Sequence, residues 1–511
     1  MPDLPRRSAL SALSAVAVLA AGAGAAAFAA GESSAGGDAA GNGWRIGSGG
    51  TLPVDDRSAQ IKGYASAASV PVGGVLDFHV STRPARRYRI TVHRVDGGGA
   101  DGGARLLAAS PELRGTEHPV PEPHPRTGLI RCDWPVGWRL EVPRGWPSGS
   151  YLAAFTAESG HRSYAPFVVR DDGRRAGLLV VLPFATYQAY NQWPLDGRTG
   201  RSLYYGYGHD PSGGAAEASG TPVDAAGAAM AYGLRARQVS FDRPYSGIGL
   251  PQRADMDFHA VRWLEREGFG ADAVYAAGTD LHDGTADLSR YRAVVFTGHD
   301  EYWSAPMREA VAAAVDGGTS VAFLGANNVY WHVRFPGAGA RTVECWKTDP
   351  DPAPGPGGPT RRWRDLGRHS EEAEQRLLGV QYNGIPRTEV PLVVARSRHW
   401  FWAGTGVADG HAVPRIVGGE ADGLDEAAPR PAAAVEQVLL SASPYRPHGR
   451  AEATLTQHTS LYRTGRGALF FVAGTFNWPA GLDRPGYADP RIQRATRNLL
   501  RRMTASGRGS D

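Results

Sequence analysis

Four continuous apolar runs in the C-terminal two-thirds of the chain constrain its fold more than any other feature. They are LLVVLPF, RAVVFTG, SVAFLG and ALFFVAG, at residues 178–184, 292–298, 320–325 and 468–474. Strands that are apolar on both sides are typical of a parallel sheet that helices cover on both faces. Between and after these runs lie helical patterns, at residues 257–267, 306–315 and 490–503. This alternation predicts an α/β domain with a doubly wound, mostly parallel sheet.

The segment before these runs has the pattern of an antiparallel sheet. Between about residues 63 and 170, short alternating segments such as VLDFHVST and YRITVHRV are separated by glycine and proline turns. Such a pattern predicts a β-sandwich. We therefore predict a β-sandwich domain at residues 51–172, the α/β domain at residues 173–505, and a tail at residues 506–511.

The N-terminus predicts export. Arg6 and Arg7 precede a run of small and apolar residues that ends at Ala30 in an A-x-A-like sequence. This is the pattern of a secretory signal peptide, and the paired arginines resemble a twin-arginine signal. The run could also serve as a single membrane anchor. We predict a signal peptide at residues 1–30, a flexible leader at residues 31–50, and a secreted or cell-surface protein.

Composition limits the partners and the kinds of site. Lys and Arg number 55 against 51 Asp and Glu, and a net charge of +4 is too small to indicate nucleic acid or a membrane surface. Cys132 and Cys345 are the only cysteines, which excludes a cysteine zinc site but allows one disulfide or two buried thiols. We expect a small-molecule substrate, no nucleic acid, no membrane contact beyond the N-terminal run, and allow for a homo-oligomer.

Polar and aromatic side chains follow the apolar runs, where ligands of open parallel sheets bind. The segments after the runs and a separate loop, VSFDRPYSG, supply Tyr187, Tyr190, Asn191, His299, Asp300, Glu301, Tyr302, Asn327, Asn328, Phe476, Asn477, Asp242, Arg243 and Tyr245. Because the carboxyl ends of parallel strands share one edge, these side chains predict a single pocket.

His299 and Glu301 are two residues apart, so an extended backbone would point both side chains to the same side. Such a pair can bind a metal, act as acid and base, or hold a loop. Phenolate and carboxylate are hard oxygen ligands that favour Fe(III) over zinc or copper. The nucleophile elbow, the H-E-x-x-H motif and the P-loop are absent. Asp300 and Glu301 are adjacent and would point to opposite faces, which disfavours the carboxylate pair of a glycosidase.

Four segments, TYQAYN, FDRPYS, GHDEYWS and FLGAN, resemble the large (beta) subunit of N,N-dimethylformamidase, in its C-terminal amidotransferase-like domain. The resemblance covers about residues 175–500, and the preceding sandwich resembles the β-domain that accompanies this domain. It implies a fold like that of class I glutamine amidotransferases and flavodoxin. It also implies a mononuclear non-haem ferric ion, held by two tyrosines and a glutamate, that activates water to hydrolyse a small amide.

The resemblance assigns metal ligands residue by residue. Glu301 of GHDEYWS matches the glutamate ligand, and Tyr245 of FDRPYS matches one tyrosine. The other tyrosine falls in TYQAYN, where we choose Tyr190 and keep Tyr187 as the alternative.

The resemblance also implies catalytic and pocket residues. His299 matches a histidine next to the metal that would handle protons, and Asn327 matches an asparagine that would donate to the developing oxyanion. Glu301 is counted with them as catalytic. Phe476 matches a pocket phenylalanine, and we place Tyr187 and Asn328 in the same substrate pocket.

Two differences from the family shape the functional prediction. The family's enzyme is cytoplasmic and works with a small companion subunit, whereas this chain has an export pattern and no such subunit within it. We therefore expect an exported amidohydrolase that acts on a small amide or N-acyl compound other than dimethylformamide. The alternative is a non-catalytic cell-surface carbohydrate-binding protein, in which sugars would stack on Trp193, Trp331, Trp400 and Trp402.

Overall fold

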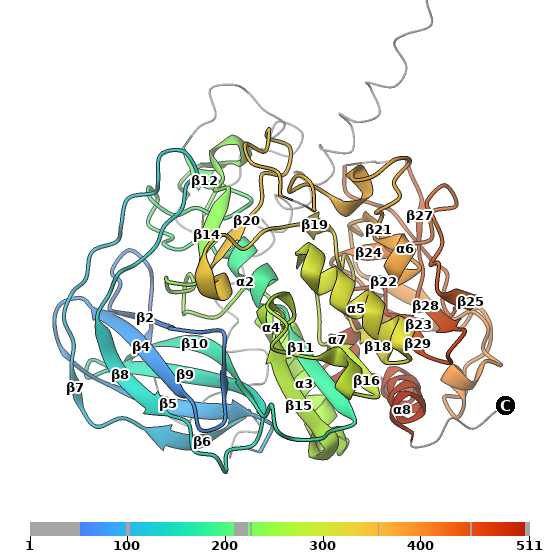
Figure 1. Cartoon of the computed structure of the whole chain (residues 1–511), viewed down its shortest axis with the longest axis horizontal. Coiled ribbons are helices and arrows are strands. Elements are labelled where there is room, and N and C mark those ends of the chain that lie inside the picture. The colour runs from blue at the N-terminus through green and yellow to red at the C-terminus, as the bar shows by residue number, and fades with distance from the viewer. Residues whose placement is uncertain are drawn as a thin grey trace, which may run out of the picture.

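Two sheet systems of different kinds make up the structure, the first mostly antiparallel and the second mostly parallel (Figure 1). The computed structural model describes residues 52–98, 103–208, 223–224, 227–355, 357–449 and 452–505. The predicted signal peptide, leader and C-terminal tail lie outside these residues. Within the described ranges, no helix combines the length and the apolar character needed to cross a membrane.

The first system consists of two sheets that pack face to face around one hydrophobic core. The larger sheet has the order β1 (Leu52–Pro53), β10 (His161–Arg170), β9 (Gly149–Ala157), β5 (Arg87–Val95) and β6 (Ala104–Ala109), with β3 (Ser69–Pro71) beside β10 and β7 (Leu113–Arg114) beside β5. The smaller sheet has the order β2 (Ile61–Ala65), β4 (Val75–Thr82) and β8 (Val136–Glu141). Phe78 on β4 meets Phe155 on β9 and Phe167 on β10, at ring distances of 5.9 and 5.8 Å. These rings join the two layers.

The second system is a seven-stranded sheet built on the four apolar runs. Its order is β15 (Ala273–Ala277), β11 (Leu178–Leu182), β16 (Ala293–Phe296), β18 (Ser320–Phe323), β29 (Leu469–Val472), β28 (Ser460–Thr464) and β25 (Ala434–Leu439). The first five strands are parallel, and β28 runs antiparallel to both of its neighbours, β29 and β25. Every residue of the five parallel strands is buried, which explains why the runs are apolar throughout.

Two groups of helices pack on this sheet (Figure 1). One group is α3 (Ala254–Arg266), α7 (Trp478–Asp483) and α8 (Pro490–Thr504), and the other is α4 (Thr279–His282) and α5 (Ala305–Gly317). Gly318, with φ of 106°, ends α5 in the left-handed conformation that glycine adopts at low cost. The prediction of a mixed α/β chain is confirmed.

Short elements fill the connections of the sheet and carry much of the candidate site. The first connection holds α2 (Phe184–Tyr190), β12 (Gly206–Tyr207), β13 (Met230–Ala231) and β14 (Gln238–Ser240), and β17 (Tyr302–Trp303) follows β16. Between β18 and β29 lie β19 (Trp331–His332), β20 (Thr342–Glu344), α6 (Gln375–Leu378), β21 (Gln381–Gly384), β22 (Val390–Val393), β23 (Ala412–Val417), β24 (Ala421–Gly423), β26 (Ser443–Tyr445) and β27 (Leu455–Gln457). The pairs are β12 with β13, β14 with β20, β17 with β19, β21 with β24, β22 with β23, and β26 with β27.

Buried polar contacts join the sandwich to the α/β part. Arg94 on β5 lies with Nη2 2.6 Å from Oε1 of Glu265 on α3. Lys62 on β2 is 1% exposed and donates to Asp56 and to the carbonyl oxygen of Gly247. Because buried charges are costly unless paired, these contacts fix the two parts against each other.

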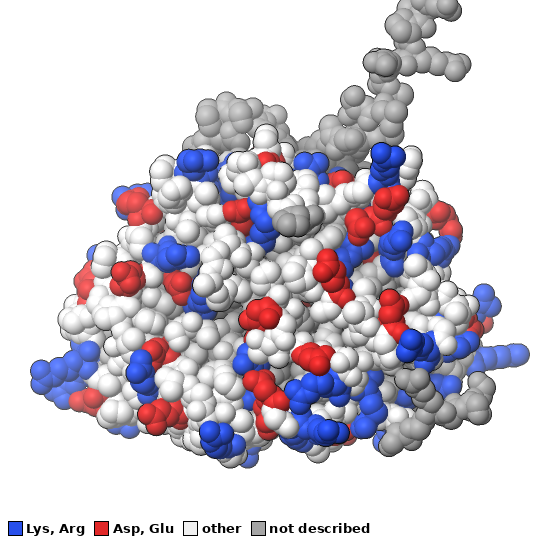
Figure 2. All heavy atoms as spheres, in the orientation of Figure 1, with Lys and Arg blue, Asp and Glu red and all other residues white. Residues whose placement is uncertain are grey.

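Charged side chains of both signs are interspersed over the face that Figure 2 shows. This mixed distribution agrees with the small net charge of +4. The two cysteines, Cys132 and Cys345, are both buried and free. Of the two arrangements that the sequence allows, the structure therefore has two separate thiols.

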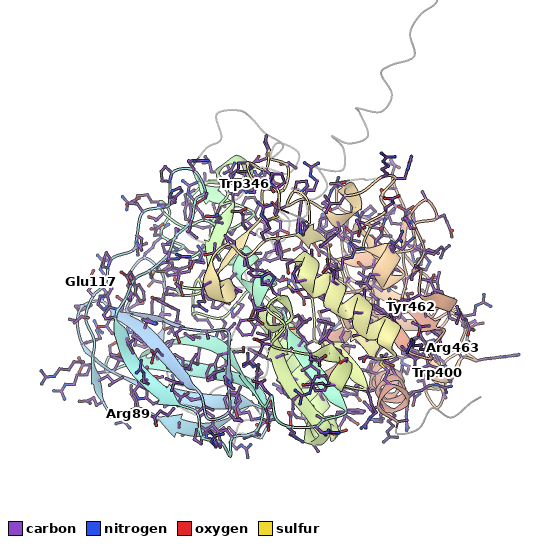
Figure 3. The ribbon with its side chains drawn as sticks, viewed as in Figure 1. Arg89, Glu117, Trp346, Trp400, Tyr462 and Arg463 are labelled. Atoms are coloured by element: carbon purple, nitrogen blue, oxygen red, sulfur yellow. The ribbon has the colours of Figure 1, made fainter. Side chains whose placement is uncertain are left out.

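Three of the four tryptophans considered for sugar stacking are inaccessible. Trp193, Trp331 and Trp402 are 2%, 4% and 2% exposed. Trp400, labelled in Figure 3, packs under the guanidinium of Arg502 at 4.8 Å. The carbohydrate-binding alternative therefore loses three of its four predicted stacking residues, because a buried indole cannot lie against a sugar ring.

Candidate active site

Glu301 is the centre of a buried cluster of oxygen atoms. Its carboxylate accepts hydrogen bonds from the phenol of Tyr190, 2.7 Å from Oε2, and from the phenol of Tyr204, 2.8 Å from Oε1 and 2.9 Å from Oε2. The two phenol oxygens are 3.0 Å apart. Glu301 is 1% exposed. One carboxylate and two phenols therefore converge on a single point, and these are the residues that could hold a metal ion.

Local structure explains this convergence. Tyr190 is the last residue of α2, which begins at once after β11, and Glu301 lies in the loop that follows the adjacent strand β16. Thr186 on α2 accepts the backbone N–H of Glu301 at 2.9 Å and so fixes the loop to the helix. The ring of Tyr204 stacks on that of Tyr190 at 4.6 Å.

The structure places the three predicted tyrosines in different surroundings. Tyr190 contacts Glu301, as expected, whereas the hydroxyl of Tyr187 donates to Asp257 at 2.8 Å. In the described part of the chain, no hydrogen bond joins Tyr245 to Glu301, and its buried hydroxyl lies near Gln188 instead.

The resemblance predicts Tyr245 as a metal ligand together with Glu301, and among the described residues the Tyr245 hydroxyl makes no hydrogen bond to that carboxylate. The FDRPYS loop is held by Asn191, whose side-chain amide donates to the carbonyl of Pro244 at 2.9 Å. Tyr204 is the second phenol that contacts Glu301. It lies in RSLYYGYGH, which follows no apolar run, so the strand-end argument could not find it.

His299 and Asn327 extend the cluster, and a second carboxylate joins it. Nε2 of His299 is 3.3 Å from Oε2 of Glu301, and Nδ1 is 2.9 Å from the carbonyl of Ala326. The side-chain nitrogen of Asn327 is 3.3 Å from Oε1 of Glu301 and 2.8 Å from Oε2 of Glu420. Glu420, directly before β24, was not predicted, because no apolar run precedes it.

Burial and neighbouring charge control the protonation of these groups. Burial alone would lower the pKa of His299, but the hydrogen bond to Glu301 and the charge of Glu420 raise it to about 9. Burial, partly offset by His299 and reinforced by Glu301, raises the pKa of Glu420 to about 7. Burial and the charge of Glu301 raise the pKa values of Tyr190 and Tyr204 well above the ordinary phenol value.

Lys347 is buried next to Tyr204 and Tyr302. Nζ of Lys347 donates to the hydroxyl of Tyr302 at 2.8 Å and lies 3.5 Å from the ring centre of Tyr204. Burial would raise the pKa of Glu301, but its hydrogen bond to His299 and the charges of His299 and Lys347 hold it below the ordinary value. A negative carboxylate is therefore favoured at the centre of the cluster.

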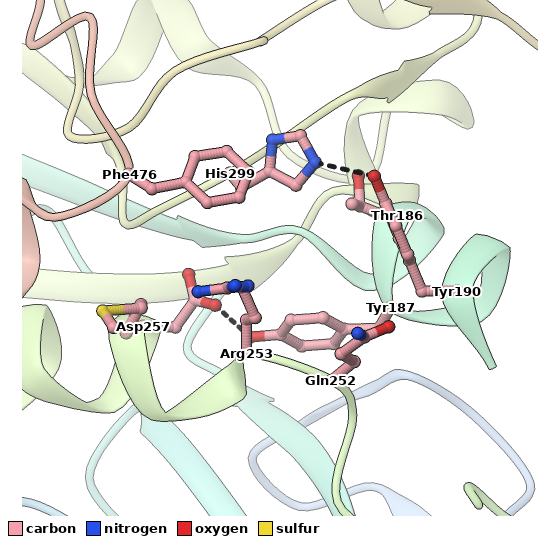
Figure 4. A pocket seen from close by; sticks show the side chains of 9 residues that line it. Thr186, Tyr187, Tyr190, Gln252, Arg253, Asp257, His299 and Phe476 are labelled. Atoms are coloured by element: carbon pink, nitrogen blue, oxygen red, sulfur yellow. Dashed lines mark hydrogen bonds between the residues drawn. The ribbon is translucent and has the colours of Figure 1, made fainter. Parts of the chain in front are cut away.

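A cavity of about 30 Å³ opens beside this cluster (Figure 4). It is lined by Thr186, Tyr187, Tyr190, Gln252, Arg253, Met256, Asp257, His299 and Phe476. The ring of Phe476 lies 4.4 Å from that of His299. Tyr187 and Phe476, two of the three residues predicted to line a substrate pocket, thus line this cavity. Asn328 does not: its Oδ1 accepts the backbone N–H of Asp300 at 3.1 Å and braces the loop.

Within the part of the chain that the structure describes, His, Cys, Asp and Glu alone do not form a metal site. Among the residues that the structure describes, no three side chains of these types lie together in a way that could hold an ion. The cluster around Glu301 is of another kind, because two of its three oxygen donors are phenols.

Comparison with known proteins gives one extensive match. The family described as N,N-dimethylformamidase beta subunit-like, C-terminal, matches residues 89–491. An N,N-dimethylformamidase beta subunit from Alcaligenes sp. is 27% identical over 232 residues, which are 40% of this chain and 28% of that subunit. The chain thus spans less than a third of the length of this relative.

Two solved structures show only a weak likeness to the chain. A cycloisomaltooligosaccharide glucanotransferase of Paenibacillus sp. is 9% identical with a TM-score of 0.18, covering 83% of this chain and 72% of its own. An alkylpurine DNA glycosylase of Pseudomonas fluorescens is 13% identical with a TM-score of 0.13, covering 22% of this chain and 30% of its own. Scores this low carry no argument about fold or function.

Proposed function

The chain belongs to the N,N-dimethylformamidase beta subunit-like, C-terminal family, and we propose that it hydrolyses the C–N bond of a small amide with a ferric ion held by Glu301, Tyr190 and Tyr204. The family itself indicates an amide hydrolase. The observation that carries the metal proposal is the convergence of two phenols on one buried carboxylate.

The donor set fits a hard trivalent cation. Glu301, Tyr190 and Tyr204 can supply three anionic oxygens, which match Fe(III) in charge and in hardness. Binding would require the two phenols to release the protons that they now donate to Glu301. A bound ferric ion supplies Lewis acidity, which polarises an amide carbonyl and makes water more acidic.

The remaining side chains have roles that their contacts suggest. With its pKa raised to about 7, Glu420 can take up a proton from water and return it to the leaving amine near neutral pH. His299 adds a positive charge beside the carboxylates, because its pKa is raised to about 9. The side-chain nitrogen of Asn327 points at both Glu301 and Glu420, so we assign it to holding these two carboxylates rather than to an oxyanion.

Three further parts of the proposal concern the protein as a whole. We propose that the parallel sheet is an amidotransferase-like, doubly wound scaffold, with the site at the carboxyl ends of its strands. We also propose export, on the N-terminal pattern of residues 1–30. The relative's designation as a beta subunit implies a companion subunit for that protein, and we propose that this chain acts on a small molecule.

Elemental analysis and visible spectroscopy of the purified chain test the proposal. We expect one iron per chain, a tyrosinate-to-iron charge-transfer band, and release of amine from a panel of small amides. Glu301→Gln should remove both the iron and the amine release while the protein remains folded. A colourless wild-type protein that takes up no Fe(III) on reconstitution and releases no amine would overturn the proposal.

A further inference from the structure

A second cavity, of about 260 Å³, lies close to the candidate active site but shares no lining residue with the pocket of Tyr190 and His299. Lys347 lies between the two sites: it lines the second cavity, and its Nζ is 3.5 Å from the ring centre of Tyr204. Trp331 lines the second cavity as well, with its ring centre 4.6 Å from the same Nζ. The second cavity is therefore a separate place for a small molecule.

The lining of the second cavity carries a positive charge that no carboxylate balances. Asp365 is the one acidic side chain of the lining, and Nε and Nη2 of Arg362 already bind its two carboxylate oxygens at 2.6 and 2.8 Å. Within the described part of the chain, the side chain of Arg361 forms no ion pair and no hydrogen bond. Because a guanidinium stays charged at any pH at which the protein is folded, Arg361 favours an anion in this cavity.

The lining also presents N–H donors that lack acceptors. Nε of Arg361 and Nε1 of Trp331 are buried, and neither has a hydrogen-bond partner among the described residues. Nζ of Lys347 makes one hydrogen bond, to the hydroxyl of Tyr302 at 2.8 Å, and has further donor capacity. A buried donor without an acceptor costs about 1–3 kcal/mol. A ligand with several acceptor oxygens would remove this cost at more than one donor at once.

We propose that the second cavity binds a small oxyanion, through its carboxylate or phosphate group, and that Arg361, Trp331 and Lys347 hold this group. A guanidinium presents a planar fork of N–H donors that matches either group with two hydrogen bonds. The indole N–H adds a donor that carries no charge. The bound group would touch none of the three residues assigned to the ferric ion. The inference therefore goes beyond the proposed function and does not depend on it.

Calorimetric titration of the full chain with sodium phosphate, and separately with sodium acetate, tests this site at constant ionic strength. We expect saturable binding of at least one of the two anions, and affinity at least about tenfold weaker in Arg361→Met, which should fold because the side chain has no bond to lose. Arg368→Met is the matched control, because it removes an exposed arginine that does not line the cavity, and it should bind like the wild type. Trp331→Phe keeps a ring beside Lys347 but removes the indole donor, and should weaken binding at least about threefold.

Glu301→Gln separates this site from a bound ferric ion, which can itself attract oxyanions. Binding that Glu301→Gln retains and Arg361→Met weakens would support the inference, whether or not the protein holds iron or releases amine, and a preference between phosphate and acetate would then identify the group. Binding that Glu301→Gln abolishes and Arg361→Met leaves unchanged would place the anion on the iron, and so overturn the inference while leaving the proposed function intact. Absence of saturable binding, or equal weakening in Arg361→Met and Arg368→Met, would also overturn it.

Discussion

Replacing Tyr204 with phenylalanine tests the assignment that differs most from the sequence prediction. The change removes one hydroxyl from a buried ring and leaves the ring's stacking on Tyr190 and its contact with Lys347 in place. Glu301 then keeps Tyr190 but loses the donor that lies 2.8 and 2.9 Å from its two oxygens. Tyr245→Phe is the matched control, because it removes an equally buried hydroxyl that has no bond to Glu301.

The size of the effect follows from the contacts. Tyr204 has one proton to donate, so its two short distances count as one hydrogen bond to a charged group, worth about 1.5–3 kcal/mol. The free energy of unfolding of the metal-free protein should fall by about that amount in Tyr204→Phe. In Tyr245→Phe it should fall by no more than about 1 kcal/mol, because no charged partner is lost.

Urea denaturation measures the stability, and iron titration followed by visible absorption measures the ligand set. Tyr204→Phe should bind iron more weakly and give a weaker, shifted charge-transfer band, since only Tyr190 remains as a phenolate donor. Tyr245→Phe should match the wild type in both. The reverse pattern, with the band changed only in Tyr245→Phe, would refute the reasoning and restore the assignment made from the sequence.

Three further predictions concern stability and the pocket. Burial raises the pKa of Asp257 from 3.8 to about 7, so the folded chain keeps a proton that the unfolded chain has released. The free energy of unfolding of the wild type should therefore fall as pH rises from about 4 to 7. Asp257→Asn lacks this titrating group, so its free energy of unfolding should rise relative to that of the wild type, by up to about 4 kcal/mol at pH 7, in urea titrations at each pH. Arg94→Met leaves Glu265 partly buried without its partner at 2.6 Å and should cost about 3–5 kcal/mol, read from the same titrations; a loss under 1 kcal/mol would show that the pair does not hold the two parts together. Gly419→Ala would bring a methyl group within 2.6 Å of the Phe476 ring at φ of +71°, so it should cost about 1–3 kcal/mol and raise KM; unchanged KM would argue against a substrate contact by that ring.

The parallel sheet was predictable because a strand that is buried on both faces is apolar at every position, and such a run is visible in the sequence. The four apolar runs became β11, β16, β18 and β29, the strands whose residues are all buried. The edge strand β15, AVYAA, is equally buried but alanine-rich, so it does not stand out from helical sequence. Its place in the sheet depends on packing against the sandwich, which a local pattern does not record.

The residues of the candidate site fall into two groups, those that could be predicted from the sequence and those that could not. Tyr190, His299, Glu301 and Asn327 follow buried strands, so the end of each strand fixes where the side chain lies, and the structure brings all four together. Tyr204 and Glu420 lie in long connections between strands of the sheet, and tertiary contacts determine the path of these connections. No local pattern marks such residues.

The chain contains only two lysines, Lys62 and Lys347, and the structure buries both, at 1% and 3% exposure. Lys62 lies on β2 of the sandwich and is bound to Asp56, and Lys347 is enclosed by the rings of Tyr204 and Trp331. Reagents that acylate side-chain amines should therefore find no target on the folded protein. Each lysine would then be labelled only in molecules whose structure around it has unfolded. The labelling rate at Lys62 would report on unfolding of the sandwich, and the rate at Lys347 on unfolding near Glu301.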